Sequence, residues 1–127
     1  MDVSANLTNA TPQKALDLEL ALSRVGGDRE LLQELIELFL QESPKMLSEL
    51  QDATGAGDAQ TVENTAHGLK GSAANFGAEA TVDAAFRLEM LGREKKNAEF
   101  SEALLALEEN LLRLSQELAN IEEEPAQ

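Results

Sequence analysis

Apolar residues recur at spacings of three and four along several long segments of this 127-residue chain, and that pattern constrains the fold most. The last such segment carries one apolar stripe, made of Phe100, Leu104, Leu107, Leu111, Leu114 and Leu118. This spacing places side chains on a single face of an α-helix. Aromatic residues make up 3% of the chain, with no Trp and no Tyr, so residue types that favour strands are scarce. The sequence therefore predicts an all-α protein.

Glycine, proline and aspartate residues mark the expected helix boundaries. A short first helix should begin near Pro12 and end at Gly26-Gly27, and a long second helix should run from an Asp28 cap to residues 54–57. Pro44 lies inside that second helix, where we expect a kink or a restart without a chain break, because the apolar stripe resumes in phase. Further helices are expected at about 58–76, 78–93 and 98–121.

These lengths predict an antiparallel up-down four-helix bundle with a short additional N-terminal helix. Residues 1–13 read as a disordered lead or linker, residues 14–121 as the bundle, and residues 122–127 as a charged tail. Because the chain supplies four long helices of its own, we expect a monomer.

A net charge of −14 argues against binding to nucleic acid or to anionic membranes, and it suits either solubility or a partner with a basic surface. The chain has no Cys, no glycine-rich phosphate loop, no membrane-length apolar run and no signal-peptide pattern at its start. We therefore expect a cytoplasmic protein with no cofactor and no metal site of its own.

The single histidine, His67, falls in the expected helix at 58–76. The apolar residues of that helix lie within roughly 40° of one direction at about 100° per residue. They are Val62, Ala66, Leu69, Ala73 and Phe76. His67 lies about 140° from the centre of this stripe, so it should face outward.

The outer face around His67 is built from small and polar residues. They are Glu63, Asn64, Gly68, Lys70, Gly71, Ala74 and Asn75. Lys70 lies one turn away and could hold a phosphoryl oxygen. Glycine inside a helix costs about 1 kcal/mol relative to alanine, so Gly71 indicates close approach by another molecule, or else tight packing within the chain. A neutral imidazole is a competent nucleophile, and such a site needs exposure, a nearby cation and a partner for the other ring nitrogen.

The run Ala66-His67-Gly68-Leu69-Lys70-Gly71, continuing to Ala78, resembles the signature of the histidine-phosphotransfer (HPt) family, whose core motif is His-x-x-Lys-Gly. Other features of the chain are also similar to that family, and the resemblance covers about residues 14–121. These features are Gly26-Gly27-Asp28, Phe39, Pro44, and Leu88-Glu89 followed by Arg93. The resemblance implies a phosphorelay intermediate in two-component signalling that has no autonomous catalysis.

The resemblance also implies roles for individual residues. His67 would accept the phosphoryl group at Nε2, Lys70 would steady it, and Gly71 would leave room for the partner. Glu89 matches a position where the related domain of chemotaxis kinases has a Glu bonded to the phospho-accepting His. The implied partners are response-regulator receiver domains and a hybrid sensor kinase. The receiver would supply the Asp, the Mg²⁺ and the catalysis.

Two faces are expected on the helix at 78–93. One carries Ala80, Ala84, Leu88 and Leu91, and the opposite one carries Val82, Phe86, Glu89 and Arg93. Glu89 is then either the group that orients His67 or a solvated carboxylate paired with Arg93. Val82 and Phe86 are either a docking patch for the partner's first helix or core residues.

Other functions share this pattern. The chain could be the HPt region of a chemotaxis-type histidine kinase, phosphorylated by a kinase domain elsewhere. It could also be a structural bundle in which His67 is incidental. A dimerising kinase region would need two chains to assemble four helices.

Overall fold

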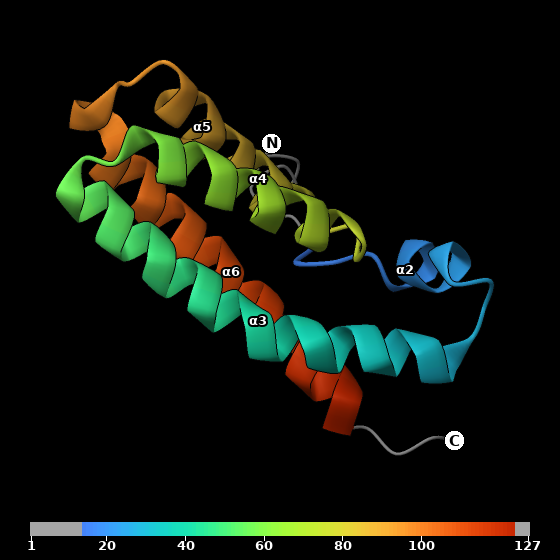
Figure 1. Ribbon diagram of the computed structural model, residues 1–127. Coiled ribbons are helices and arrows are strands. Elements are labelled where there is room, and N and C mark those ends of the chain that lie inside the picture. The colour runs from blue at the N-terminus through green and yellow to red at the C-terminus, as the bar shows by residue number, and fades with distance from the viewer. Residues whose placement is uncertain (1–13, 124–127) are drawn as a thin grey trace, which may run out of the picture.

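The computed structural model describes residues 14–123 as a bundle of helices (Figure 1). Its elements are α2 (Leu18–Arg24), α3 (Arg29–Ala56), α4 (Ala59–Ala74), α5 (Glu79–Arg93), the short 3-10 helix η1 (Asn97–Glu99) and α6 (Phe100–Glu123). No strand occurs in this range, so the all-α class is confirmed. No helix within the same residues combines the length and the apolar character needed to cross a membrane.

Aspartate side chains begin three of the helices. Asp17, Asp28 and Asp58 accept hydrogen bonds from the backbone N–H groups of Leu20, Leu31 and Thr61. Each carboxylate satisfies an amide that has no partner within its helix and lies at the positive end of the helix dipole. The caps predicted at Asp28 and Asp58 are confirmed.

The predicted start of the first helix near Pro12 is wrong, because residues 14–17 are not helical and α2 begins at Leu18. The backbone N–H of Asp17 donates instead to the carbonyl of Phe76, at 2.8 Å. Pro12 itself and the rest of the predicted lead, residues 1–13, lie outside the described residues. Glu122 and Glu123 of the predicted tail continue α6.

Helix α3 runs unbroken through Pro44. Proline lacks the N–H that would bond the carbonyl four residues earlier. Pro44 lies at an exposed position, where solvent can satisfy a freed carbonyl. The expectation that the chain does not break at Pro44 is confirmed, and the helix does not restart there.

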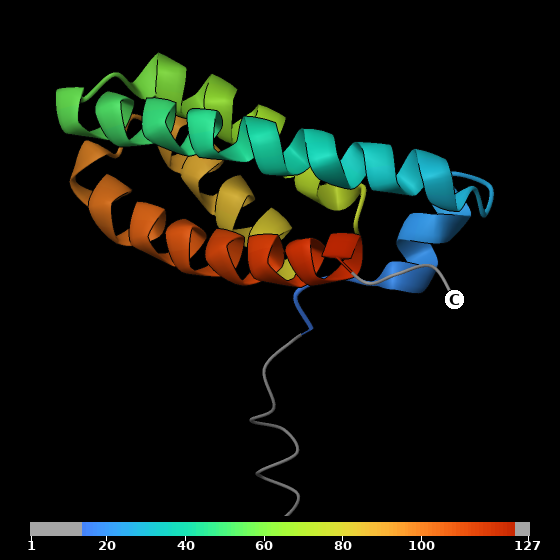
Figure 2. The same ribbon diagram turned by 90° about the horizontal axis from the view of Figure 1, so that it is seen from below.

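The four long helices alternate in direction and close into a ring of contacts, α3 with α4, α4 with α5, α5 with α6 and α6 with α3 (Figures 1 and 2). At one end, the side-chain amide of Asn97 donates to the carbonyl of Gly57 at 3.1 Å and joins the start of η1 to the end of α3. The architecture is the predicted antiparallel bundle.

The unequal lengths of the four long helices explain where α2 lies in the bundle. Helices α3 and α6 have 28 and 24 residues, whereas α4 and α5 have 16 and 15. The longer pair therefore extends past the turn between α4 and α5, and α2 lies at that end (Figure 1). Gly77 in that turn has a φ of +62°, and a Cβ there would lie 2.7 Å from the Cβ of Asp17. Only glycine lets the turn meet the start of α2.

The core is aliphatic and runs the length of the bundle. Its largest fully buried side chains include Ile36, Leu50, Leu69, Leu88, Leu107, Leu114 and Leu118. Phe39 and Phe76 meet edge to face, with ring centroids 5.4 Å apart, and this contact joins α3 to the turn after α4.

Helices α4 and α5 make the most intimate contact of the bundle, and Gly92 allows it. A Cβ on Gly92 would lie 2.8 Å from the backbone nitrogen of Glu63 and 2.9 Å from the carbonyl oxygen of Ala59. Both atoms belong to the backbone of α4, so no side-chain rotation could relieve the clash. Glycine at this position therefore sets how near the two helices lie.

The faces predicted for α5 are partly wrong. Thr81, Ala85, Leu88, Glu89, Leu91 and Gly92 are buried, whereas Ala80 and Ala84 are only half-buried. Helix α5 packs on α4 and on α6, so its buried face is wider than a single stripe. Glu89 belongs to this buried face and not to the opposite, solvated one.

We predict that Gly92→Ala destabilises the fold by about 1–3 kcal/mol, because the added methyl group pushes α5 away from the α4 backbone. Urea denaturation measures the change. Gly55→Ala is the matched control, since Gly55 is also helical and a Cβ there meets nothing within 4 Å. The control should be neutral or stabilising by up to about 1 kcal/mol. Equal stability of the two variants would contradict the packing argument.

Candidate functional site

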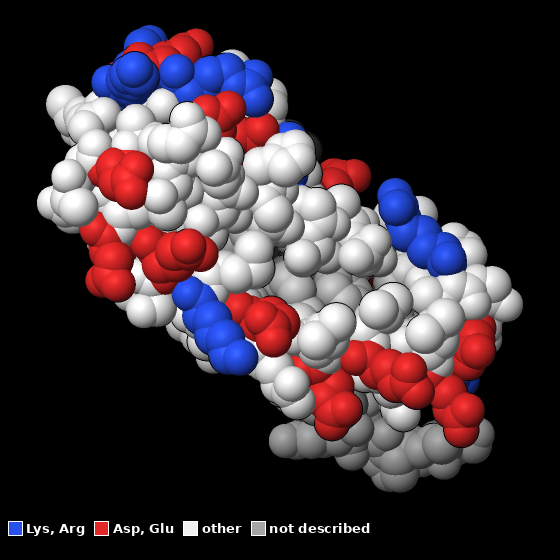
Figure 3. All heavy atoms as spheres, viewed as in Figure 1, with Lys and Arg blue, Asp and Glu red and all other residues white. Residues whose placement is uncertain are grey.

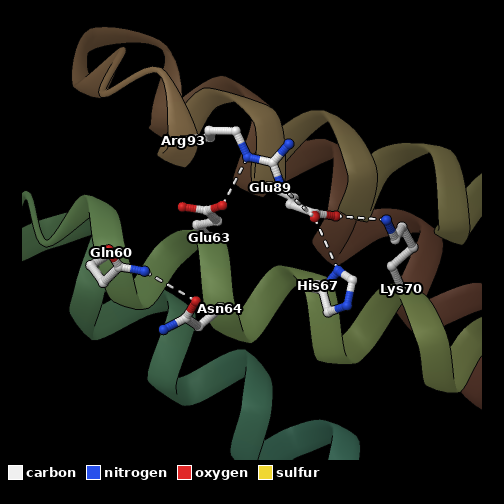
Figure 4. A network of polar contacts seen from close by, with 7 residues as sticks. All are labelled: Gln60, Glu63, Asn64, His67, Lys70, Glu89 and Arg93. Atoms are coloured by element: carbon white, nitrogen blue, oxygen red, sulfur yellow. Dashed lines mark hydrogen bonds and ion pairs between the residues drawn. The ribbon is translucent and has the colours of Figure 1, made fainter.

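His67 projects from α4 into solvent, as its periodicity predicts. All five residues of the predicted core stripe are buried, and 68% of the His67 side chain is exposed. The ring leans toward α5, where the side chain of Glu89 meets it (Figure 4).

The carboxylate of Glu89 holds one ring nitrogen of His67. The distance from His67 Nδ1 to Glu89 Oε2 is 3.0 Å, and the Glu89 side chain is only 3% exposed. An ionised carboxylate can only accept, so Nδ1 carries the hydrogen and donates. In the neutral ring, Nε2 is then left with its lone pair. The geometry therefore supports the orienting role over the alternative of a solvated carboxylate.

Lys70 also points to Glu89. Its Nζ lies 2.8 Å from Glu89 Oε1, so a charged ammonium is in direct contact with the buried carboxylate. The ammonium also stands 4.9 Å from the centre of the Phe86 ring, within range of a cation–π interaction. The Lys70 side chain is 25% exposed. Lys70 and His67 thus gather around one carboxylate, and Phe86 lies beside the ammonium of Lys70.

The surroundings of Glu89 keep it ionised. Burial by itself would raise the pKa of this carboxyl. The hydrogen bonds and charges of Lys70 and His67 together outweigh burial and hold the pKa of Glu89 below its ordinary value. The site therefore contains a fixed negative charge beside the Nδ1–H of His67.

Arg93 completes the network from the C-terminal turn of α5. Its Nε donates to Glu63 Oε2 at 2.9 Å, and its Nη2 lies 3.4 Å from Glu89 Oε2 (Figure 4). Arg93 therefore does pair with Glu89 at i+4, but this contact is longer than its contact with Glu63. Glu63, expected only as part of the docking face, is the anchor of Arg93.

The two glycines beside His67 have different surroundings. A Cβ on Gly71 would meet nothing within 4 Å, so packing inside the chain does not require glycine there. A Cβ on Gly68 would lie 3.2 Å from the terminal methyl of Met46, at the end of a flexible side chain on α3. Gly68 is therefore explained in part by packing between helices, whereas Gly71 borders open space.

The remaining predicted docking residues lie along the same outer surface but outside the polar network. Asn64 accepts a hydrogen bond from the Gln60 amide at 3.1 Å, and Asn75 is the exposed C-cap of α4. Ala74 is half-buried. Phe86 is 47% exposed and Val82 half-buried, so of these two, Phe86 is the one available to a partner.

Sequence reasoning missed Gly92 and the position of Arg93 between two carboxylates. Gly92 follows Glu89 by three residues and Arg93 follows it by four, so both lie near Glu89 on the same helix. A glycine inside a helix is a signal of close packing. The signal does not reveal which helix approaches, because that depends on the crossing of α4 and α5.

One exposed histidine, held by a buried carboxylate on an antiparallel helical bundle, defines a domain that presents an imidazole without enclosing a substrate. The Hpt domain family model matches residues 34–124, well over half of the chain. The chain therefore belongs to the Hpt domain family, and its role is histidine phosphotransfer in a two-component phosphorelay.

Two solved structures share the fold. Histidine-containing phosphotransfer protein B (HptB) from Pseudomonas aeruginosa PAO1 superposes with a TM-score of 0.83 at 23% identity, covering 91% of this chain and 100% of that one. The HPT domain of an Hpt sensor hybrid histidine kinase from Shewanella has a TM-score of 0.76 at 20% identity, covering 85% and 93%. No curated protein matches the sequence.

We predict that Glu89→Gln destabilises the protein by about 1–3 kcal/mol at neutral pH, because Lys70 and Arg93 lose their buried counter-charge. The pKa of Glu89 is lowered by folding, so its stabilisation is present above the ordinary value of 4.5 and is lost as the pH falls through the folded-state pKa. The stability difference between the wild type and Glu89→Gln should therefore narrow in acid. Chemical denaturation at a series of pH values measures it, and a difference that widens in acid would contradict this account.

Proposed function

We propose that His67 accepts a phosphoryl group at Nε2 from the aspartyl phosphate of a receiver domain and passes it to the Asp of another receiver. The observation that carries this proposal is the exposed ring whose Nδ1 is bonded to the buried carboxylate of Glu89, 3.0 Å away. That contact leaves Nε2 as the nucleophilic atom on the solvent side.

The transfer step follows from this arrangement. The Nε2 lone pair forms the N–P bond while the bond between phosphorus and the aspartyl oxygen breaks, and the Asp leaves as a carboxylate. The proton on Nδ1 stays in place, so the ring becomes cationic. The Glu89 carboxylate stabilises that positive charge because it is already fixed at hydrogen-bond distance. The return step reverses these changes onto the second receiver.

Lys70 is proposed to steady the phosphoryl group. Its ammonium is close to the ring through their shared contact with Glu89, and a flexible four-carbon stem lets it turn outward. The loss of its contact with Glu89 Oε1 is offset by a charge-assisted bond to a phosphoryl oxygen.

The surface around His67 suits a docking partner. The exposed residues of α4 beside it are uncharged: Gln60, Asn64, Gly68, Gly71 and Asn75. Figure 3 shows a largely uncharged strip across this face, with acidic side chains gathered over other parts of it. A chain of net charge −14 can therefore present this site without strong repulsion of an acidic receiver pocket.

The remaining chemistry is proposed to belong to the receiver. It would bind the Mg²⁺ and supply the Asp, while this chain acts as a phosphocarrier with no catalysis, cofactor or metal of its own, as a monomer in the cytoplasm. A hybrid sensor kinase is a fitting source of such a receiver. Incubation with ATP alone should leave the protein unlabelled, and labelling by ATP would contradict the carrier role.

We predict that a phosphorylated receiver labels the wild-type protein with acid-labile phosphate and that His67→Gln takes up none. The change removes the ring nucleophile and, because the side chain is mostly exposed, should leave folding intact. Radiolabel transfer followed by acid and alkali treatment measures the result, and circular dichroism confirms that the variant is folded. Absence of label on the wild type across a panel of receivers would refute the function, and label on the variant would refute the site.

We predict that Gly71→Leu slows transfer from a receiver about tenfold or more, while its stability stays the same or rises. A Cβ at this position meets nothing within 4 Å, so the larger side chain extends into the open space that an approaching partner would enter. Transfer rates at increasing receiver concentration measure docking. Gly55→Leu is the matched control, because Gly55 is equally open and lies near the far end of α3. Normal docking by Gly71→Leu would show that the partner approaches elsewhere.

A further inference from the structure

Glu89 depends on two cations and on the ring N–H of His67 at once. Its carboxylate is 3% exposed and has Lys70 Nζ at 2.8 Å, His67 Nδ1 at 3.0 Å and Arg93 Nη2 at 3.4 Å. A buried carboxylate that loses its compensating charges becomes costly and tends to take up a proton. A protonated Glu89 would no longer stabilise the cationic ring that phosphotransfer creates.

Lys70 cannot contact the carboxylate of Glu89 and a phosphoryl group on His67 equally well at the same time. Under the proposed function, a phosphoryl group on Nε2 brings about one and a half to two negative charges to the exposed side of the ring. Lys70 lies one turn after His67 on α4, and its flexible side chain can turn from Oε1 to the phosphoryl oxygens. When Lys70 turns to the phosphoryl group, Glu89 loses its closest cation.

Arg93 is held in a position where it stays beside Glu89 when Lys70 turns away. Its guanidinium is held by Glu63, one turn before His67 on α4, through the 2.9 Å bond between Nε and Oε2. It approaches the same Glu89 oxygen that accepts from His67. The hydrogen bond and the charge of Glu63 raise the pKa of Arg93 further, so the cation is permanent.

We propose that Arg93, anchored by Glu63, is a positioning residue for phosphotransfer. It keeps Glu89 ionised and turned toward His67 Nδ1 while Lys70 is engaged by the phosphoryl group. Arg93 touches neither the ring nor the transferred group in this arrangement, and it acts only through Glu89. The inference rests on the proposed phosphorylation of His67.

The charged groups that face Glu89 come from two helices. His67 and Lys70 contact it from α4, with Glu63 behind Arg93, and Arg93 lies on α5 itself. In the part of the chain that the structure describes, neither α3 nor α6 contributes an ion pair to Glu89. A change in how readily Glu89 takes up a proton can therefore be assigned to these groups.

The test is the pH dependence of transfer from a phosphorylated receiver to Arg93→Gln. Loss of the guanidinium raises the pKa of Glu89, so the acid limb of the rate profile should move to higher pH. On the acid side of the profile the rate should fall by up to about tenfold, the factor that accompanies a rise of one pKa unit, whereas near neutral pH Glu89 stays ionised and the rate should change little. Arg93→Lys should restore part of the rate, because it keeps the charge without the planar fork.

The matched control is Arg87→Gln. Arg87 is also an arginine of α5, paired with Glu102 of α6 at 3.3 Å and not with the site. Its profile should match that of the wild type. In a Glu89→Gln background, Arg93→Gln should have no further effect on the rate, because Arg93 acts only through the carboxylate. If Arg93→Gln proves poorly folded by urea denaturation, Glu63→Ala replaces it, since that variant removes the acceptor that anchors the guanidinium.

The possible outcomes separate the two proposals. If the wild type takes up phosphate on His67 and Arg93→Gln has an unchanged pH profile, Arg93 has no positioning role and the proposed function stands. An equal loss of rate at all pH values, or an undiminished effect in the Glu89→Gln background, would also overturn the positioning role. If His67 takes up no phosphate at all, the proposed function fails, and the inference fails with it.

Discussion

The ionised carboxylate of Glu89, buried where α4 and α5 meet, is the interaction on which the site depends. Gly92 lets the two helices approach closely, and Glu89 lies one turn before it on α5. From there, the carboxylate reaches both His67 and Lys70 on the neighbouring helix. A charge removed from water needs partners of opposite sign, so the same group that orients the histidine also gathers the cations around it.

The bundle presents this site without enclosing it. The aliphatic core fixes α4, and the exposed ring of His67 rests on that rigid support with one nitrogen held and the other open to solvent. Gly71, one turn after His67, has no side chain, and the space beside it is open. Such a geometry suits a group carrier, because a partner can meet the reactive nitrogen directly. It agrees with the phosphotransfer role of the Hpt domain family to which the chain belongs.

Much of the fold was predictable, because the decisive signals are local. The core stripe of α4, the caps at Asp28 and Asp58, and the outward His67 all follow from periodicity and from the chemistry of helix ends. The start of α2 was not predictable, because Asp17 is bonded to the carbonyl of Phe76, far away in the sequence. The buried face of α5 was misjudged for a related reason: contacts with two helices widen it beyond one stripe.

The sequence by itself determined which residues could form the site: a single histidine on the outer face of a helix, a lysine one turn on, two glycines beside them and a Glu on the next helix. Only the tertiary structure decided how they are paired. It placed Lys70 on Glu89, set Gly68 against Met46 while leaving Gly71 open, and held Arg93 between Glu63 and Glu89. The physical reason is that periodicity specifies the direction in which a side chain leaves its own helix. The distance to a side chain on another helix depends on how closely the two backbones pack, and here Gly92 sets that distance.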